Sequence, residues 1–211
     1  MAIKKSSKVT SAIDMTAMCD VAFLLLTFFI LTATAKVPEP ISVEVPSSTK
    51  DDKLPEDGLV TITVGSGKDN VFVDIEGREL REKTLEFMSA KYEVGFTVEQ
   101  SKEFQLMESF GTPITELGSV IDLKSERNKA GVQKGIPFTD TLGAQNQLKD
   151  WIFTARQANL DLLGPKANDL KFAVKGDAKL QYPKIKKIMD ILQDQNINTF
   201  DLVTGLRGKD Y

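Results

Sequence analysis

Asp20 is the only ionisable side chain in the apolar stretch MTAMCDVAFLLLTFFILTATA, which runs from Met15 to Ala35. A carboxylate in a hydrocarbon environment is costly unless it is protonated, paired with a cation or in contact with water. These three states define the chemistry open to such a group, and acids placed this way usually mark functional sites. Asp20 is therefore the first candidate functional residue of the chain.

Polar side chains continue from Asp20 along one side of the expected helix. Thr16, Asp20, Thr27 and Thr34 follow one another in steps of four, seven and seven residues, a spacing that keeps them on one slowly drifting stripe. Polar side chains in membrane helices face partner helices or water, so Thr16 and Thr27 are expected to support Asp20. The alternative is that the threonines bond back to their own backbone, which we prefer for Thr32 and Thr34 taken alone.

The stretch 15–35 is long enough to cross a bilayer, because about 1.5 Å per residue gives roughly 30 Å. Residues 1–14 carry three lysines and one aspartate, whereas the far flank offers Lys36 and then Glu39. Basic flanks stay in the cytoplasm, so we expect a cytoplasmic tail at 1–14, a single membrane helix and an external remainder. A cleaved signal peptide ending at Ala33-Thr34-Ala35 is the weaker interpretation, since Asp14 and Asp20 interrupt such a leader.

Composition excludes several functional classes. The chain contains no histidine, which removes His-based catalysis and most zinc sites. Cys19 is the single cysteine and lies within the apolar stretch, so it has no disulfide partner in the chain. The net charge of −3 leaves no basic patch for nucleic acid, and Gly65-Ser66-Gly67 is better explained as a hairpin turn than as a phosphate loop. We expect a protein that is not an enzyme and that binds no cofactor and no metal.

Residues 36–58 have the composition of an extended linker, with four of the eight prolines of the chain. Within it, Ile41, Val43 and Val45 alternate with polar residues. This alternation is typical of a strand, and we expect the segment to add to a sheet edge in a partner or in a sister subunit.

Residues 59–211 are expected to form an external α+β domain with a mainly antiparallel sheet packed by helices. The predicted strands are 59–64, 71–75, 170–175 and 199–204, and the predicted helices near its end are 143–159 and 183–193. Residues 82–141 differ in character and read as largely helical, with helices at 81–91 and 97–110 and a loop at 124–135. A capping box at Thr97 and Gln100 marks the start of the second of these helices.

The residues around Asp20 resemble a known family. Ile13-Asp14-Met15-Thr16-Ala17-Met18-Cys19-Asp20 is similar to the I-N-V-T-P-x-x-D signature of the ExbD/TolR family, the proton-driven energy-transducing subunits of bacterial inner membranes. The segment ending at Pro46 and the order of the outer strands and helices are similar as well, which leaves 82–141 as an insertion. Ala17 replaces the usual proline and Asp14 the usual asparagine of this signature.

The resemblance implies a homodimer of such helices inside a multi-pass partner of the ExbB/TolQ type, where Asp20 takes up and releases protons. Thr16 and Thr27 would then be hydrogen-bonding neighbours, and the periplasmic domain would pass the movement to a TonB-like protein. A TolR-like role in envelope integrity is an alternative. Two further alternatives stay open: an anchored binding protein in which Asp20 pairs with a cation on another helix, and a secreted, cleaved domain.

Overall fold

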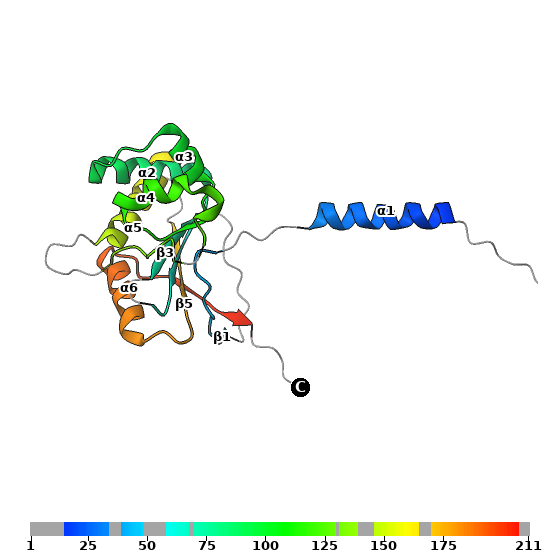
Figure 1. The fold of residues 1–211 in the computed structure, drawn as a ribbon. Helices are drawn as coiled ribbons and strands as arrows, with labels where there is room; N and C mark the ends of the chain where they lie inside the picture. The colour runs from blue at the N-terminus through cyan, green and yellow to red at the C-terminus, as the bar shows by residue number, and fades with distance from the viewer. Residues whose placement is uncertain are drawn as a thin grey trace, which may run out of the picture. The chain divides into compact units, whose positions relative to one another are not determined.

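The computed structural model describes residues 15–33, 39–48, 58–67, 70–129, 131–138, 146–164 and 170–206. The chain divides into two compact units, Met1–Pro38 and Glu39–Tyr211, each with its own internal contacts. The first unit contains helix α1 (Met15–Thr32), and the second, which we call the outer unit, contains all other helices and strands (Figure 1).

Helix α1 is 18 residues long and none of its side chains is buried. Leucine, alanine and methionine favour the helix, and Ala33 N donates to Phe29 O at 2.9 Å to extend the ladder at its end. By length and composition this helix is able to cross a membrane. The predicted span 15–35 agrees with it up to Thr32, and residues 34 and 35 lie outside the described residues.

The main sheet of the outer unit has five strands in the order β4-β3-β2-β5-β6. They are β2 (Leu59–Val64), β3 (Val71–Ile75), β4 (Ser109–Phe110), β5 (Lys171–Gly176) and β6 (Asp201–Val203). A separate pair joins β1 (Ser47–Ser48) in parallel to β7 (Gly205–Leu206). The hairpin predicted at Gly65-Ser66-Gly67 is confirmed, because β2 and β3 are antiparallel and Gly65 N donates to Asn70 O.

The α+β class is confirmed, although the sheet is evenly mixed and not mainly antiparallel. The β2–β3 and β3–β4 pairs are antiparallel, whereas β5 runs parallel to both β2 and β6. The reason is connectivity: β5 reaches β6 through a helix, and a helical crossover returns the chain in the same direction. The two strands predicted at 170–175 and 199–204 are present, each within about two residues of its predicted ends.

Five helices and one short 3₁₀ turn complete the described part of the outer unit. They are α2 (Arg78–Tyr92), α3 (Val98–Gln105), α4 (Ile114–Asp122), η1 (Lys124–Glu126), α5 (Gln147–Leu163) and α6 (Tyr182–Asp194). The capping box predicted for α3 is confirmed: Thr97 Oγ1 accepts from Gln100 N, and Gln100 Oε1 accepts from Thr97 N. Helix α4 is missing from the predicted elements, and α3 is shorter than predicted because its chain continues into β4.

One continuous core joins the sheet to residues 82–141. Trp151 of α5 is fully buried and packs against Phe104 and Phe110, with ring centroids 6.1 and 4.6 Å away. The same core contains Ile62 of β2 and Phe172 of β5. Figure 1 shows α2, α3 and α4 gathered at one end of the outer unit, with α5 and α6 beside the strands. The described part of 82–141 is therefore an integral part of this fold.

Candidate functional site

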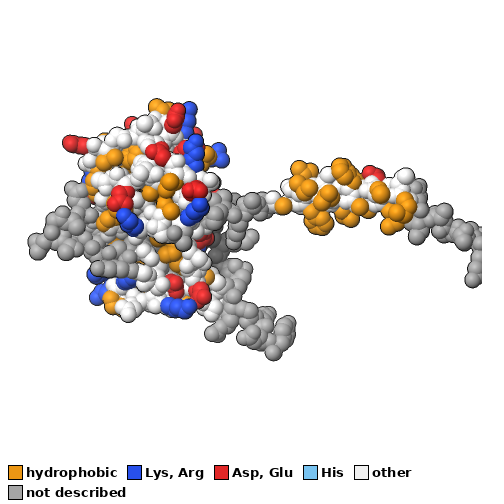
Figure 2. Space-filling view, in the orientation of Figure 1, with side chains coloured by type: hydrophobic (Ala, Val, Ile, Leu, Met, Phe, Trp, Pro, Cys, Tyr) orange, Lys and Arg blue, Asp and Glu red, His pale blue; other side chains and the backbone are white. Residues whose placement is uncertain are grey.

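Asp20 lies one and a half turns into α1, about 7 Å from its first residue by the rise of an α-helix. Its side chain is exposed, as are all the others of α1 except the half-buried Thr27. Figure 2 shows a helix covered by hydrophobic side chains apart from one acidic group. Asp20 and Thr27 are seven residues apart and so lie on the same side, about 10 Å from each other along the axis.

Two threonines of α1, Thr27 and Thr32, already have backbone partners. Thr27 Oγ1 donates to Leu24 O at 2.9 Å, and Thr32 Oγ1 donates to Phe28 O at 2.8 Å. This is the back-bonding that we considered as the alternative to a functional stripe, and it leaves the oxygen of each hydroxyl group able to accept. Thr27 can therefore accept a hydrogen bond from a further donor without giving up its own.

The segment that was expected to add to another subunit lies along its own outer unit. Ile41, Val43 and Val45 are half-buried and alternate with exposed residues, as predicted. Main-chain bonds hold the segment at two points: Ala178 N donates to Glu44 O at 2.6 Å, and Gly205 N donates to Pro46 O at 2.9 Å.

Two ion pairs reinforce this position of residues 39–48. Glu39 lies 2.6 Å from Lys175 Nζ, and Glu44 lies 3.0 Å from Lys179 Nζ. Residues 39–46 thus lie along the outer unit of the same chain without forming a strand, and Ser47–Ser48 form β1. Addition of this segment to a sister subunit or a partner stays a prediction, as do the domain limits 36–58 and 59–211.

A second polar cluster surrounds Asp74 of β3. Asp74 pairs across the sheet with Thr61 and Ser109, and its buried Oδ1 has no hydrogen-bond partner. Burial raises the pKa of Asp74 from 3.8 to about 7, and the neighbouring Glu76 adds to that effect, while the positive charge of Arg81 opposes it. Asp74 is a carboxyl group that changes its charge near neutral pH.

Arg81 ties this cluster to the end of α3. It is buried, its Nη1 donates to Gln105 O at 2.8 Å and to Met107 O, and its Nε has no partner. Burial also lowers the pKa of Arg81. The sequence offered one signal for the cluster, a single acid within the apolar strand Val71-Phe72-Val73-Asp74-Ile75, but it gave no sign of Arg81.

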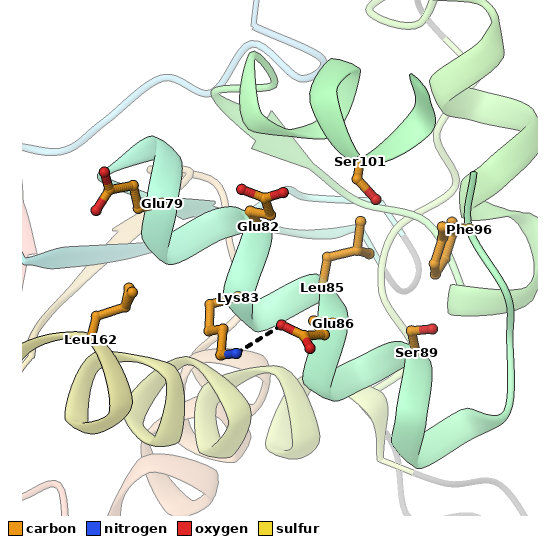
Figure 3. A pocket seen from close by; sticks show the side chains of 9 residues that line it. All are labelled: Glu79, Glu82, Lys83, Leu85, Glu86, Ser89, Phe96, Ser101 and Leu162. Atoms are coloured by element: carbon orange, nitrogen blue, oxygen red, sulfur yellow. Dashed lines mark ion pairs between the residues drawn. The ribbon is translucent and has the colours of Figure 1, made fainter. Parts of the chain in front are cut away.

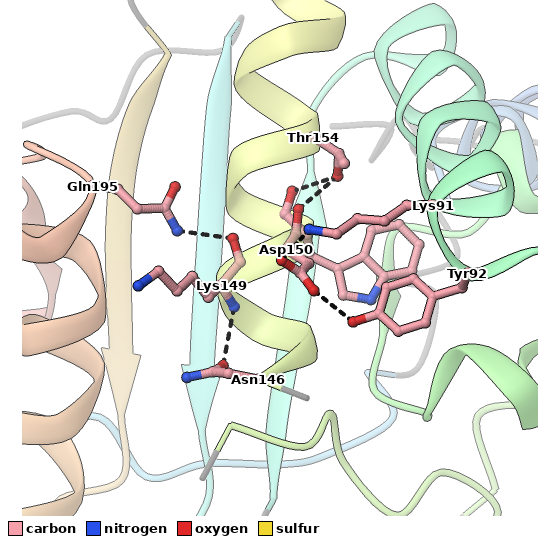
Figure 4. A network of polar contacts seen from close by, with 8 residues as sticks. Lys91, Tyr92, Asn146, Lys149, Asp150, Thr154 and Gln195 are labelled. Atoms are coloured by element: carbon pink, nitrogen blue, oxygen red, sulfur yellow. Dashed lines mark hydrogen bonds and ion pairs between the residues drawn. The ribbon is translucent and has the colours of Figure 1, made fainter. Parts of the chain in front are cut away.

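The polar network of Figure 4 joins three helices. Asp150 of α5 accepts from Tyr92 Oη at 2.6 Å and pairs with Lys91, so it links α5 to α2. Gln195 Nε2 donates to Lys149 O at 2.8 Å, which links α5 to the end of α6. Burial and then Asp150 raise the pKa of Tyr92. These contacts join α5 to α2 and to the end of α6, and others such as Thr154 Oγ1 to Asp150 O lie within α5, so we assign the network to the scaffold.

No group of three or more potential metal ligands occurs within the part of the chain that the structure describes. Three features can thus be compared with known proteins: the apolar helix with its acid, the 39–48 segment and the mixed α+β outer unit. The family model for the biopolymer transport protein ExbD/TolR matches residues 6–135, which is more than half of the 211 residues. The chain belongs to the ExbD/TolR family.

The match begins before α1 and ends before α5, so it includes both Asp20 and most of the segment 82–141 of this ExbD/TolR protein. The family is described as biopolymer transport proteins, and α1 is one helix of this chain that is able to cross a membrane by length and composition.

A weaker similarity links the chain to Translocase of chloroplast 120 of Arabidopsis thaliana. The two are 27% identical over 154 residues, which cover 72% of this chain but only 13% of the plant protein. This chain thus spans about an eighth of that relative. No solved structure matches the chain.

Proposed function

We propose that this protein is an ExbD-like subunit that couples proton flow across the inner membrane to a TonB-like protein for transport at the outer membrane. Helix α1 spans the membrane once, with residues 1–14 in the cytoplasm and the outer unit in the periplasm. The observation that supports this most is the placement of one acid, Asp20, in a helix that is otherwise apolar and has no buried side chain.

Asp20 is the proton carrier in this proposal. A charged carboxylate loses much more favourable hydration among apolar side chains than the protonated form does, so protonation changes which surface the helix prefers. In a homodimer, two such helices would lie inside a multi-pass ExbB/TolQ-type ring. Each Asp20 would alternate between a position in contact with water and a position among apolar side chains. Thr27, on the same side of α1 and able to accept a hydrogen bond, lies about 10 Å along the axis from Asp20, so it would extend the polar side that faces the partner without bonding to the Asp20 carboxyl of its own helix.

The outer unit would transmit this movement to the TonB-like partner. The movement would enter the outer unit through residues 39–48, because they follow α1 in the chain and are hydrogen-bonded to β7 and to the residues after β5. Force applied to this segment would reach β5 of the main sheet through the pair of Glu39 with Lys175.

The test is an Asp20→Asn variant, compared with Asp20→Glu as a control that keeps a carboxyl group. We expect the asparagine variant to preserve copurification with the multi-pass partner and to abolish energy-dependent uptake, while the glutamate variant retains part of it. Normal uptake by Asp20→Asn would refute the proposal. Loss of copurification in Asp20→Asn would instead favour the anchored binding protein, in which Asp20 is one half of a static ion pair.

A TolR-like role in envelope integrity is the second candidate, because the matching family includes both branches. It predicts detergent sensitivity and normal TonB-dependent uptake when the gene for this chain is deleted. The ExbD-like role predicts the reverse.

A further inference from the structure

The outward side of α2 borders a hollow of about 420 Å³, which we call the α2 groove. Figure 3 shows Glu79, Glu82 and Glu86 along α2, with Leu162 of α5 on one side and Ser101 of α3 on the other. Leu85 and Phe96 supply an apolar floor. The groove therefore combines an apolar bottom with an acidic rim.

The acids of this rim are only partly neutralised. Lys83 is the one cation that lines the groove within the described residues, and it already pairs with Glu86 at 2.9 Å and with Asp161 at 3.4 Å. Glu82 accepts a hydrogen bond from Gln105, a neutral group. Among the lining residues, three carboxylates against one ammonium leave a net charge of −2, so an incoming cation finds negative charge that Lys83 does not neutralise.

The groove also offers one exposed apolar side chain from α5. Leu162 lines the groove and is 41% exposed. A highly charged ligand without apolar atoms, such as a polyamine, would leave Leu162 in water. An acidic protein surface or a nucleic acid would be repelled by the rim.

We propose that the α2 groove binds a polypeptide segment of a partner protein that carries lysine or arginine residues around one apolar side chain. The apolar side chain would lie on Leu85 and Phe96, and the basic residues would meet Glu79 and Glu82 at the rim. This inference goes beyond the proposed function, because it concerns a surface of the outer unit and holds whether or not Asp20 moves protons.

The experiment uses the whole chain in phosphatidylcholine nanodiscs, with empty nanodiscs as the blank. The probe is a short fluorescent peptide of lysine and serine with one central leucine, and binding is followed by fluorescence anisotropy at low salt. We expect a Glu79→Gln/Glu82→Gln double variant to weaken binding about tenfold, because two partly solvated ion pairs with the peptide are lost. Replacing the leucine of the peptide by serine should weaken binding to the unchanged protein as well.

The matched control is a Glu99→Gln/Glu116→Gln double variant, which removes the same charge from exposed positions outside the groove. We expect this control to bind the peptide as the unchanged protein does. Equal weakening in both double variants would overturn the proposal in favour of a general attraction to an acidic protein. Absence of binding to the unchanged protein, or equal binding of a peptide with glutamate in place of lysine, would overturn it too.

Discussion

Replacing Asp74 by asparagine should make the stability of the outer unit less dependent on pH. The folded state holds the pKa of Asp74 at about 7, above its ordinary value of 3.8, because burial disfavours the charged form. The contribution of this group to stability is therefore fully present below pH 3.8 and is lost as the pH rises through 7. The asparagine side chain would keep the shape of the neutral acid without the charge.

The size of this effect follows from the pKa interval. About 1.4 kcal/mol for each pH unit between 3.8 and about 7 gives an upper limit of about 4 kcal/mol. Asp74 retains partial exposure, so we expect solvent screening to reduce the observed difference to about 2 kcal/mol. We therefore compare the free energy of unfolding of Asp74→Asn with that of the unchanged chain at two pH values. Between pH 4.5 and pH 8, this difference should shift in favour of the variant by about 2 kcal/mol.

The assay is urea unfolding of the 211-residue chain in detergent micelles, followed by the fluorescence of Trp151. Trp151 is the single tryptophan of the chain and is fully buried in the core of the outer unit, so the signal reports on that unit alone. Asp190→Asn, at an exposed position on α6, is the control and should change stability equally little at both pH values. If Asp74→Asn differs from the unchanged chain by the same free energy at pH 4.5 and pH 8, the reasoning is wrong.

Three further predictions concern the fold. Thr97→Ala removes the capping box of α3 and should lower the free energy of unfolding by about 1 kcal/mol in the same urea assay, with Thr115→Ala, at an exposed position on α4, as a control that should stay near zero. Gly111→Ala places a Cβ against the buried ring of Phe72 and should lower the free energy of unfolding by about 1 to 3 kcal/mol. An unchanged urea midpoint would show that the ring moves freely. Lys175→Ala removes the partner of Glu39 and should lower the free energy of unfolding by less than about 1 kcal/mol. It should also speed protease cleavage near residue 39. Cleavage at the original rate would show that the ion pair does not hold the segment in place.

Local patterns predicted the elements whose signals lie in the sequence itself. The β-branched runs of β2 and β3 match their predicted limits, and the Thr97/Gln100 pair marked the start of α3 because capping involves only neighbouring residues. The apolar run gave α1 and the position of Asp20, since helix length and hydrophobicity are read directly from residue types.

Features that depend on tertiary contacts could not be predicted in this way. The parallel pairing of β5 with β2 depends on which sheet edge the chain returns to, and the place of residues 39–48 depends on Lys175 and Lys179, far along the chain. Helix α4 carries buried side chains at Ile114, Leu117 and Ile121, a helical spacing that is visible in hindsight around the exposed acids Glu116 and Asp122. The contact of Arg81 with the carbonyl groups of Gln105 and Met107 has no sequence signal at all.

The central claim is that Asp20 carries protons, and a measurement of proton flux tests this claim most directly. The chain and its multi-pass partner would be reconstituted in liposomes that enclose a pH-sensitive dye, and a potassium diffusion potential would drive protons inward. We predict that Asp20→Asn lowers the flux at least about tenfold, as expected when an essential proton carrier is removed, while Thr27→Val lowers it less. Equal flux through Asp20→Asn and the unchanged complex would contradict the account.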